Sequence, residues 1–186
     1  MKKVCVFLAD GFEEIEGLTV VDILRRAGVE TETVSVMGRK QINGSHGIRV
    51  EADKLFEEAD VADADMLVLP GGMPGTLNLK AHEGLKEQII AFDRAGKNIA
   101  AICAAPSVLG ALGLLKGKKA CAYPSFEDQL DCAEVLQVPE VTDGNITTGR
   151  GMGAAIPFAL ELTAILCGKE KAEEIKESIV YEGAVQ

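Results

Sequence analysis

The chain has 186 residues, of which 47% are hydrophobic and 26% are charged, and its formal net charge is −10 at pH 7. This composition excludes a disordered chain, and the length predicts one globular domain over residues 1–186. The excess of acidic groups argues against binding to nucleic acid or to anionic membrane surfaces, so we expect neither as a partner.

The predicted elements alternate between strands and helices. In chain order they are a strand at 3–9, a helix at 14–28, a strand at 31–37, a hairpin within 43–52, a strand at 64–72, a helix at 82–96, a strand at 97–102, a helix after Cys103, a strand at 118–124, a hairpin within 140–149, and helices at 154–168 and 169–180. Strands separated by helices need crossover connections. The pattern therefore predicts an α/β fold with a largely parallel sheet and helices on both faces.

The amino-terminal segment and the cysteines indicate a cytoplasmic protein. "MKKVCVFLAD" (1–10) has a short apolar run, but an acidic segment follows it where a signal peptide would have a small-residue cleavage site. That run is also too short to cross a bilayer. The five cysteines are odd in number and lack C-x-x-C spacing, which predicts reduced thiols and no structural zinc. With two histidines in the chain, we expect no metal centre.

Four segments of the chain are expected to meet at one edge of the sheet. In open parallel sheets, ligands bind outside the carboxyl ends of the strands. The segments that follow predicted strands are "LADGFEE" (8–14), "LPGGMPG" (69–75), "ICAAP" (102–106) and "AYPSF" (122–126). The sequence therefore predicts a functional site at this edge, with Cys103 within it.

Cys103 stands where a buried strand ends and a helix begins. Ala101 and Ala105 occupy the places of the glycines in the G-x-S-x-G nucleophile elbow, in which a side chain at a sharp turn projects from the sheet. Pro106 suits the first turn of the following helix. The pattern favours a nucleophilic cysteine. The alternative is a structural cysteine, since a buried thiol behaves as a small hydrophobe.

The helix start also bears on how the thiol is activated. Free N–H groups there favour a thiolate, so the position predicts a Cys103 pKa below the free value of about 8.5. The N–H of Ala104 and an amide of the Gly71-Gly72 turn are placed to stabilise an oxyanion. No histidine follows Cys103 in the chain, so a Cys–His couple is not supported.

Several carboxylates follow the first strand: Asp10, Glu13, Glu14 and Glu16. A carboxyl group beside a thiolate would be kept protonated by the like charge and would donate a hydrogen bond to the sulfur. It could then carry a proton during catalysis. For each of these acids, the alternative is a solvated charge at the start of a helix.

The motifs together resemble the ThiJ/PfpI family, in the branch of the parkinsonism-linked protein deglycase and within the class I glutamine amidotransferase-like superfamily. The likeness covers essentially the whole chain and rests on "LADGFEEIE" (8–16), "RRAG" (25–28), "VLPGGMPGTLNL" (68–79), "AAICAAP" (100–106) and "ITTGRGMGAAIPFALELTAILCGKE" (146–170). The resemblance implies a flavodoxin-like three-layer α/β/α sandwich that forms homodimers.

The resemblance also assigns roles to single residues. It implies that Cys103 is the nucleophile, that Glu16 is its protonated partner, and that Gly72 and Ala104 provide the oxyanion-hole amides. It further implies a pocket that includes Gly71, Tyr123 and Arg150.

Two positions depart from the family pattern. Tyr123, before Pro124, stands where the close branch often has a histidine, and a tyrosine with a pKa of about 10 is a poor general base at neutral pH. Glu16 alone, or water, would then take that role. Ala104 stands where protease-like members have a histidine, so we do not expect peptidase activity.

Three functions remain open from the sequence. The first is a cofactor-free enzyme that acts on a small reactive aldehyde such as methylglyoxal, or on a glycated adduct, through Cys103 and Glu16. The second is an oxidative-stress sensor or chaperone whose Cys103 is oxidised to a sulfinate. The third, which the missing histidine disfavours, is an amidase or peptidase.

Overall fold

The computed structural model describes residues 1–183 and contains a central sheet of seven strands. In spatial order these are β10 (Glu140–Asp143), β11 (Ile146–Gly149), β7 (Asn98–Ile102), β6 (Met66–Leu69), β1 (Lys3–Leu8), β2 (Glu30–Ser35) and β5 (Lys54–Leu55). All neighbouring strands are parallel except β10, which runs antiparallel to β11. The predicted α/β fold with a largely parallel sheet is confirmed.

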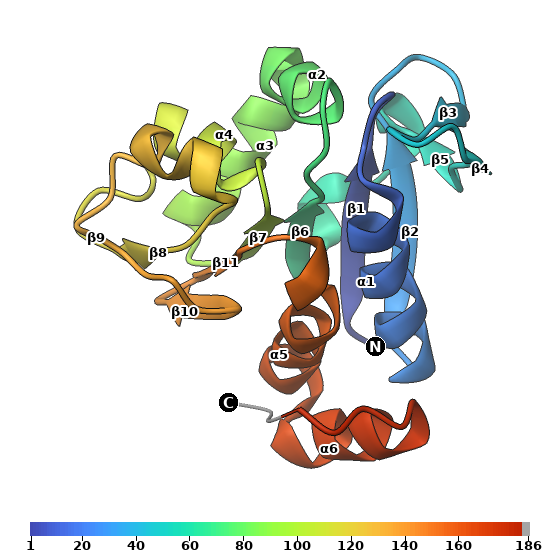
Figure 1. Cartoon of the computed structure of the whole chain (residues 1–186). Helices are drawn as coiled ribbons and strands as arrows, with labels where there is room; N and C mark the ends of the chain where they lie inside the picture. Colours follow the sequence, from blue (N-terminus) through green and yellow to red (C-terminus); the bar gives the residue numbers. More distant parts are fainter. Residues whose placement is uncertain (184–186) are drawn as a thin grey trace.

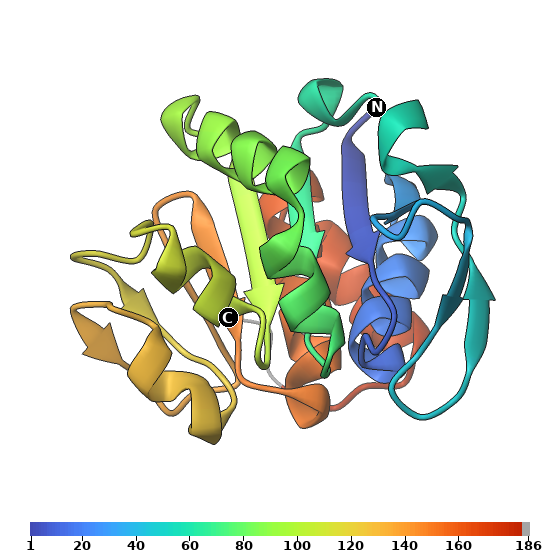
Figure 2. The same cartoon turned by 90° about the horizontal axis from the view of Figure 1, so that it is seen from above.

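Helices cover both faces of this sheet, as Figures 1 and 2 show. One layer consists of α1 (Glu14–Arg26), α5 (Ala155–Cys167) and α6 (Lys169–Ser178). The other consists of α2 (Gly75–Ala81), α3 (Glu83–Arg94) and α4 (Pro106–Ala111). The arrangement is the expected three-layer sandwich.

The strand β1 shows why strands made of apolar runs lie at the centre of the sheet. Its residues are almost all apolar, so both faces of the strand can be buried. Val4 and Val6 point into the cluster formed with α1 and α5, whereas Cys5 and Phe7 point into the cluster formed with α2, α3 and α4. A strand with two apolar faces therefore joins the two halves of the core.

The first predicted hairpin is formed by β3 (Gln41–Asn43) and β4 (Arg49–Glu51), which pair antiparallel outside the central sheet. The loop between them, residues 44–48, lies against the start of α1: the backbone N–H of Ser45 donates to the carbonyl oxygen of Phe12 at 2.9 Å. The second predicted hairpin is β10 and β11. Short 3₁₀ segments complete the fold at Phe56–Glu58, Val61–Asp63, Pro124–Gln129 and Met152–Ala154.

The prediction of a strand over 118–124 is wrong in extent and place. Only β8 (Lys119–Ala120) is extended, and it pairs with β9 (Glu134–Val135) outside the central sheet. The backbone N–H of Cys121 donates to the side-chain hydroxyl of Thr148 in β11 at 3.0 Å and not to a backbone carbonyl of that strand. Pro124, which has no N–H to donate, begins a 3₁₀ turn.

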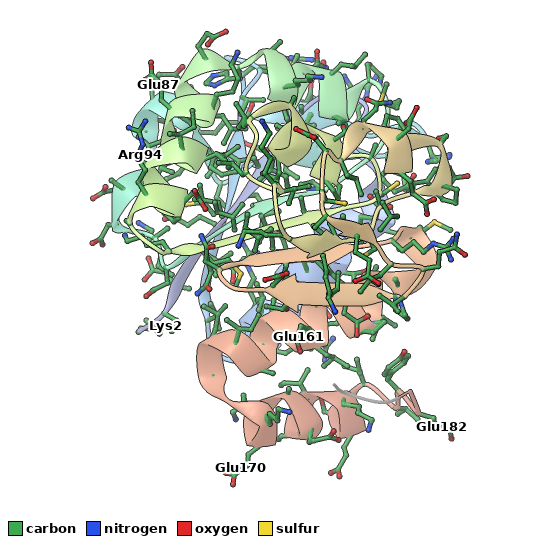
Figure 3. The ribbon with its side chains drawn as sticks, turned by 90° about the vertical axis from the view of Figure 1, so that its left-hand side faces the viewer. Lys2, Glu87, Arg94, Glu161, Glu170 and Glu182 are labelled. Carbon is green, nitrogen blue, oxygen red and sulfur yellow. The ribbon has the colours of Figure 1, made fainter. Side chains whose placement is uncertain are left out.

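Charged side chains cover the outside of the molecule. In Figure 3, Glu87 and Arg94 of α3 and Glu170 of α6 project away from the ribbon. Within residues 1–183, every helix is too short or too polar to span a bilayer.

Candidate active site

Cys103 lies at a sharp turn between β7 and α4. Its backbone φ of 66° is in the left-handed region that side-chain-bearing residues rarely adopt. The turn is held from both sides: the Cys103 N–H donates to the carbonyl oxygen of Gly149, and the N–H of Tyr123 donates to the carbonyl oxygen of Cys103, each at 2.9 Å. Such strain persists only where the surroundings enforce it and is concentrated at functional sites. The structure thus shows the elbow geometry expected from "AAICAAP".

Glu16 reaches this cysteine from the first turn of α1. Its side chain is 1% exposed, and Oε2 accepts a hydrogen bond from the backbone N–H of Gly71 at 2.9 Å. The carboxyl group also interacts with the Cys103 side chain, and among the described residues Oε1 has no hydrogen-bond partner. A buried carboxyl of this kind is costly unless it is protonated or well paired. Of the acids after the first strand, Glu16 is therefore the one placed to exchange a proton with Cys103.

The Gly71-Gly72 turn allows these side chains to approach each other. A Cβ at Gly71 would lie 2.6 Å from the Cβ of Cys103 and 2.7 Å from Oε2 of Glu16. Gly72 has a φ of +89°, and a Cβ there would collide with the backbone nitrogen of Glu13. Both positions therefore require glycine, the first for space and the second also for its backbone conformation.

Substitution of Gly71 by alanine is expected to separate the pair. The added methyl group forces Cys103 and Glu16 apart, so we expect at least a tenfold loss of any Cys103-dependent activity, with a destabilisation of about 1–3 kcal/mol. Activity and urea unfolding of Gly71→Ala measure the two effects. Gly153→Ala is the matched control, because a Cβ there meets no atom within 4 Å. Wild-type activity in Gly71→Ala would contradict this account.

The environment of Glu16 favours its protonated form. Burial raises the pKa of Glu16 to about 7, and the charge of Glu13 acts in the same direction. Hydrogen bonds from Cys103 and Gly71 oppose this rise without cancelling it. Glu16 therefore exchanges its proton near neutral pH, as a group that transfers protons should.

The expectation that Cys103 is more acidic than a free cysteine is wrong for the resting pair. Burial and the charge of the Glu16 carboxylate raise the pKa of the Cys103 thiol to about 12, although the N–H groups of Ala104 and Gly72 hydrogen-bond to it and lower the value in part. From about pH 7 to about pH 12 the pair thus holds one proton between two groups. A thiolate forms in this range when that proton lies on Glu16.

Tyr123 and Arg150 lie beside the pair, in a separate groove. This open groove has a volume of about 730 Å³ and is lined by Tyr123, Arg150, Pro139, Met152 and Tyr181 among others, but not by Cys103 or Glu16. Tyr123 is 50% exposed and is tied to the elbow through its backbone N–H. Nη2 of Arg150 lies 3.8 Å from Oε1 of Glu127. The structure thus brings Cys103, Glu16, Gly71, Gly72 and Ala104 together and places the other two predicted pocket residues next to them.

One polar cluster near the site was not singled out from the sequence. Oε1 of Glu14 accepts hydrogen bonds from the backbone N–H groups of His46 at 2.8 Å and Ile48 at 3.3 Å. Although burial opposes it, these bonds and one from the His46 side chain lower the pKa of Glu14 to about 2. Atoms of Glu13, Glu14 and His46 that could ligate a metal ion lie within 4.8 Å of one another. These atoms are instead engaged in hydrogen bonds to one another and to Ser45. The cluster therefore acts as a clamp that fastens the loop 44–48 to α1.

Comparison of the sequence with models of known protein families shows to which family the chain belongs. Residues 2–165 match the model of the DJ-1/PfpI family. The chain belongs to the DJ-1/PfpI family. This membership confirms the resemblance seen in the motifs and the flavodoxin-like fold expected from it.

Known DJ-1/PfpI proteins align with nearly the whole chain. DJ-1 homologs A and B of Arabidopsis thaliana are each 38% identical to it over 96% of its length, but the chain spans only about half of those proteins, 46% and 41%. A protein named deglycase from Thermococcus kodakarensis is 32% identical over 88% of this chain and 99% of its own. The structure of oxidized Toxoplasma gondii DJ-1 superposes with a TM-score of 0.94, at 38% identity, and covers 98% of this chain and 100% of that one.

Proposed function

We propose that the protein is a cofactor-free enzyme that acts on reactive carbonyl compounds through Cys103 and Glu16. The observation that carries this proposal is the buried Glu16 carboxyl held against a cysteine at a strained elbow, with two backbone N–H groups directed at the sulfur. The name of the Thermococcus relative, a deglycase, supports the same class of chemistry.

The first step forms a bond between the sulfur and the aldehyde carbon. With the pair's proton on Glu16, the Cys103 thiolate adds to the aldehyde of methylglyoxal, and the carbonyl electron pair moves to the oxygen. The N–H groups of Ala104 and Gly72 stabilise the developing oxyanion. Glu16 then gives its proton to that oxygen, which leaves a hemithioacetal on Cys103 and a carboxylate on Glu16.

The second step moves a proton between the two carbons of the substrate. The Glu16 carboxylate removes the proton from the sulfur-bearing carbon to give an enediolate, and returns it to the neighbouring carbon, while the hydroxyl proton passes from the first oxygen to the second. This converts the hemithioacetal into a thioester of lactate without an external oxidant. Water then hydrolyses the thioester, releases lactate and restores the thiol. A glycated amine would enter the same sequence from its carbonyl adduct, with the amine as leaving group.

The proposal is tested by lactate formation from methylglyoxal as a function of pH. Because Glu16 has a pKa of about 7 and the thiol a pKa of about 12, the doubly protonated pair below pH 7 lacks the thiolate. We therefore expect turnover to rise about tenfold per pH unit below pH 7 and to level off above it. Two controls accompany the assay: protein treated with a metal chelator, and buffer without protein. No lactate above the buffer rate at any pH would overturn the proposal.

We further propose that the protein forms homodimers in the cytoplasm. Ile15 and Leu18 of α1 and Ile48 of the clamped loop are 49%, 37% and 53% exposed, and exposed apolar side chains of this kind favour self-association. All cysteines of the chain are free thiols in the structure, which suits a reducing compartment.

Oxidation sensing is a second candidate function. The related Toxoplasma DJ-1 was solved in an oxidized form, and Cys103 is a partly exposed residue. Peroxide would oxidise a thiolate first to sulfenic and then to sulfinic acid, with water as the reduced product. Mass spectrometry after mild peroxide treatment tests this: selective sulfinate at Cys103 without lactate formation would favour the sensor.

A further inference from the structure

The groove that contains Arg150 is much larger than the aldehyde in the steps above. Its volume of about 730 Å³ lies within the range of about 300–1,000 Å³ that is typical of small-molecule sites, and methylglyoxal would fill a small part of it. Among the described residues that line the groove, Arg150 is the one with a charged side chain. The lining does not include Ile15, Leu18 or Ile48, whose exposed side chains favour self-association. The groove therefore presents one positive group on uncharged walls.

The Arg150 guanidinium has unused hydrogen-bonding capacity. The side chain is 34% exposed, and among the described residues its Nε is buried without a hydrogen-bond partner. Nη2 lies 3.8 Å from Oε1 of Glu127, which is beyond hydrogen-bond distance. That oxygen of Glu127 is likewise buried without a partner among these residues. A guanidinium held in this way can offer its planar donors to a carboxylate.

The groove adjoins the elbow through the backbone. Gly149, which immediately precedes Arg150, accepts the N–H of Cys103 at 2.9 Å, and the N–H of Tyr123 donates to the carbonyl oxygen of Cys103 at the same distance. A Cβ at Gly151 would lie 3.5 Å from a ring carbon of Tyr123, so the chain after Arg150 packs against that ring. Tyr123 and Arg150 are thus both fastened to the backbone around the reactive cysteine.

We infer that Arg150 is a specificity-determining residue that binds a carboxylate at the far end of the substrate, while the aldehyde at the other end reacts with Cys103. The inference rests on the proposed function and names its substrate class, a 2-oxoaldehyde with a distal carboxylate. The neighbouring Glu127 carboxylate disfavours a doubly charged phosphate at this place, whereas a carboxylate carries a single charge and matches the guanidinium fork.

An example of this class is 4,5-dioxopentanoate, which is methylglyoxal extended by a carboxymethyl group. The covalent steps are the same as for methylglyoxal. The sulfur of Cys103 bonds to the aldehyde carbon, the proton moves between the two carbons, and water cleaves the thioester. The product is 2-hydroxyglutarate, and no external oxidant or reductant is needed.

The test compares two thiol reagents that differ only in a distal charge. The first, 3-maleimidopropionate, carries a carboxylate, and the second, 3-maleimidopropionamide, is its uncharged isostere. Mass spectrometry of the Cys103 peptide gives the rate of each modification, and the ratio of the two rates reports recognition of the carboxylate whether or not the protein is an enzyme. We expect this ratio to fall about tenfold in Arg150→Gln and less in Arg150→Lys, which keeps the charge but not the fork.

Two further variants separate the guanidinium from the overall charge of the protein. Glu127→Gln should raise the ratio, because it removes the carboxylate that competes for Arg150. Arg94→Gln removes an exposed arginine from the outer face of α3 and should keep the wild-type ratio (Figure 3). Equal ratios in wild type, Arg150→Gln and Glu127→Gln would overturn the inference. An equal fall in Arg94→Gln and Arg150→Gln would also overturn it, because the ratio would then report net charge.

Turnover gives a second readout of the same preference. In the wild type, kcat/KM for 4,5-dioxopentanoate should exceed that for its methyl ester by about tenfold, and Arg150→Gln should lose this preference. A wild-type enzyme that turned over both compounds equally well would contradict the inference and leave the proposed function intact. A maleimide ratio that falls in Arg150→Gln, in a protein that turns over neither compound, would refute the proposed activity and support the carboxylate site.

Discussion

Cys103→Ala is expected to lower lactate formation from methylglyoxal by at least about a thousandfold, because the variant lacks the atom that forms the covalent adduct. The substitution removes one sulfur atom from a partly exposed residue and leaves the small neighbours of the elbow in place, so the fold should persist. Lactate assayed enzymatically at saturating methylglyoxal measures the effect, and circular dichroism verifies the fold.

The matched control is Cys167→Ala, which removes an exposed thiol at the end of α5. It should retain wild-type turnover. If Cys103→Ala also retained it, the reaction would not proceed through this cysteine, and the carbonyl chemistry assigned to the elbow would be wrong. Loss in both variants would instead point to a general sensitivity of the protein to cysteine replacement.

Glu16→Gln is expected to make the thiol more acidic and the protein less active. Glutamine has no charge, so the carboxylate that raises the pKa of Cys103 is absent and the thiolate should form at lower pH than in the wild type. Glutamine cannot carry the proton, however, and turnover should fall by about 10²–10⁴-fold. Ultraviolet absorbance of the thiolate against pH, with Cys103→Ala subtracted, measures the first effect.

A lower thiol pKa together with a lower turnover in Glu16→Gln distinguishes proton transfer by Glu16 from simple activation of the thiol. If Glu16 served only to tune the sulfur, a more acidic thiol at Glu16→Gln would retain or increase turnover. If the thiol titrated at the same pH in both proteins, the charge of Glu16 would not act on Cys103. Glu16→Asp is a useful companion, since it retains the carboxyl group but shortens its reach to the sulfur.

The sequence predicts the elbow well because its requirements are local. A buried strand, small residues on both sides of Cys103 and a proline in the first helical turn are all visible within "AAICAAP". The hairpins and the main helices are similarly predicted from short-range patterns. The strand expected at 118–124 failed because an apolar run does not show whether a neighbouring strand is available to pair with it.

The proton chemistry depends on distances that no spacing in the sequence reveals. Glu14 and Glu16 are both buried in the first turn of α1, yet their pKa values move in opposite directions, to about 2 and about 7. Glu14 accepts hydrogen bonds from two backbone N–H groups of a loop some thirty residues away, whereas Glu16 accepts one from Gly71 and is buried beside a cysteine. Family resemblance singled out Glu16, but the high pKa of Cys103 follows from the burial of the thiol and from its contact with that carboxylate, which only the folded structure reveals.

Burial of Glu16 also links folding to proton uptake. Its pKa rises from an ordinary value of 4.5 to about 7 in the folded chain. A group whose pKa is raised on folding contributes stability that is complete below the unfolded value and is lost as the pH rises through the folded one. Between these two values the free energy of unfolding therefore falls by about 3 kcal/mol. The ionised Glu16 carboxyl thus destabilises the native state over the pH range in which the Cys103–Glu16 pair loses its first proton. The side chain that makes the site reactive also lowers the stability of the fold.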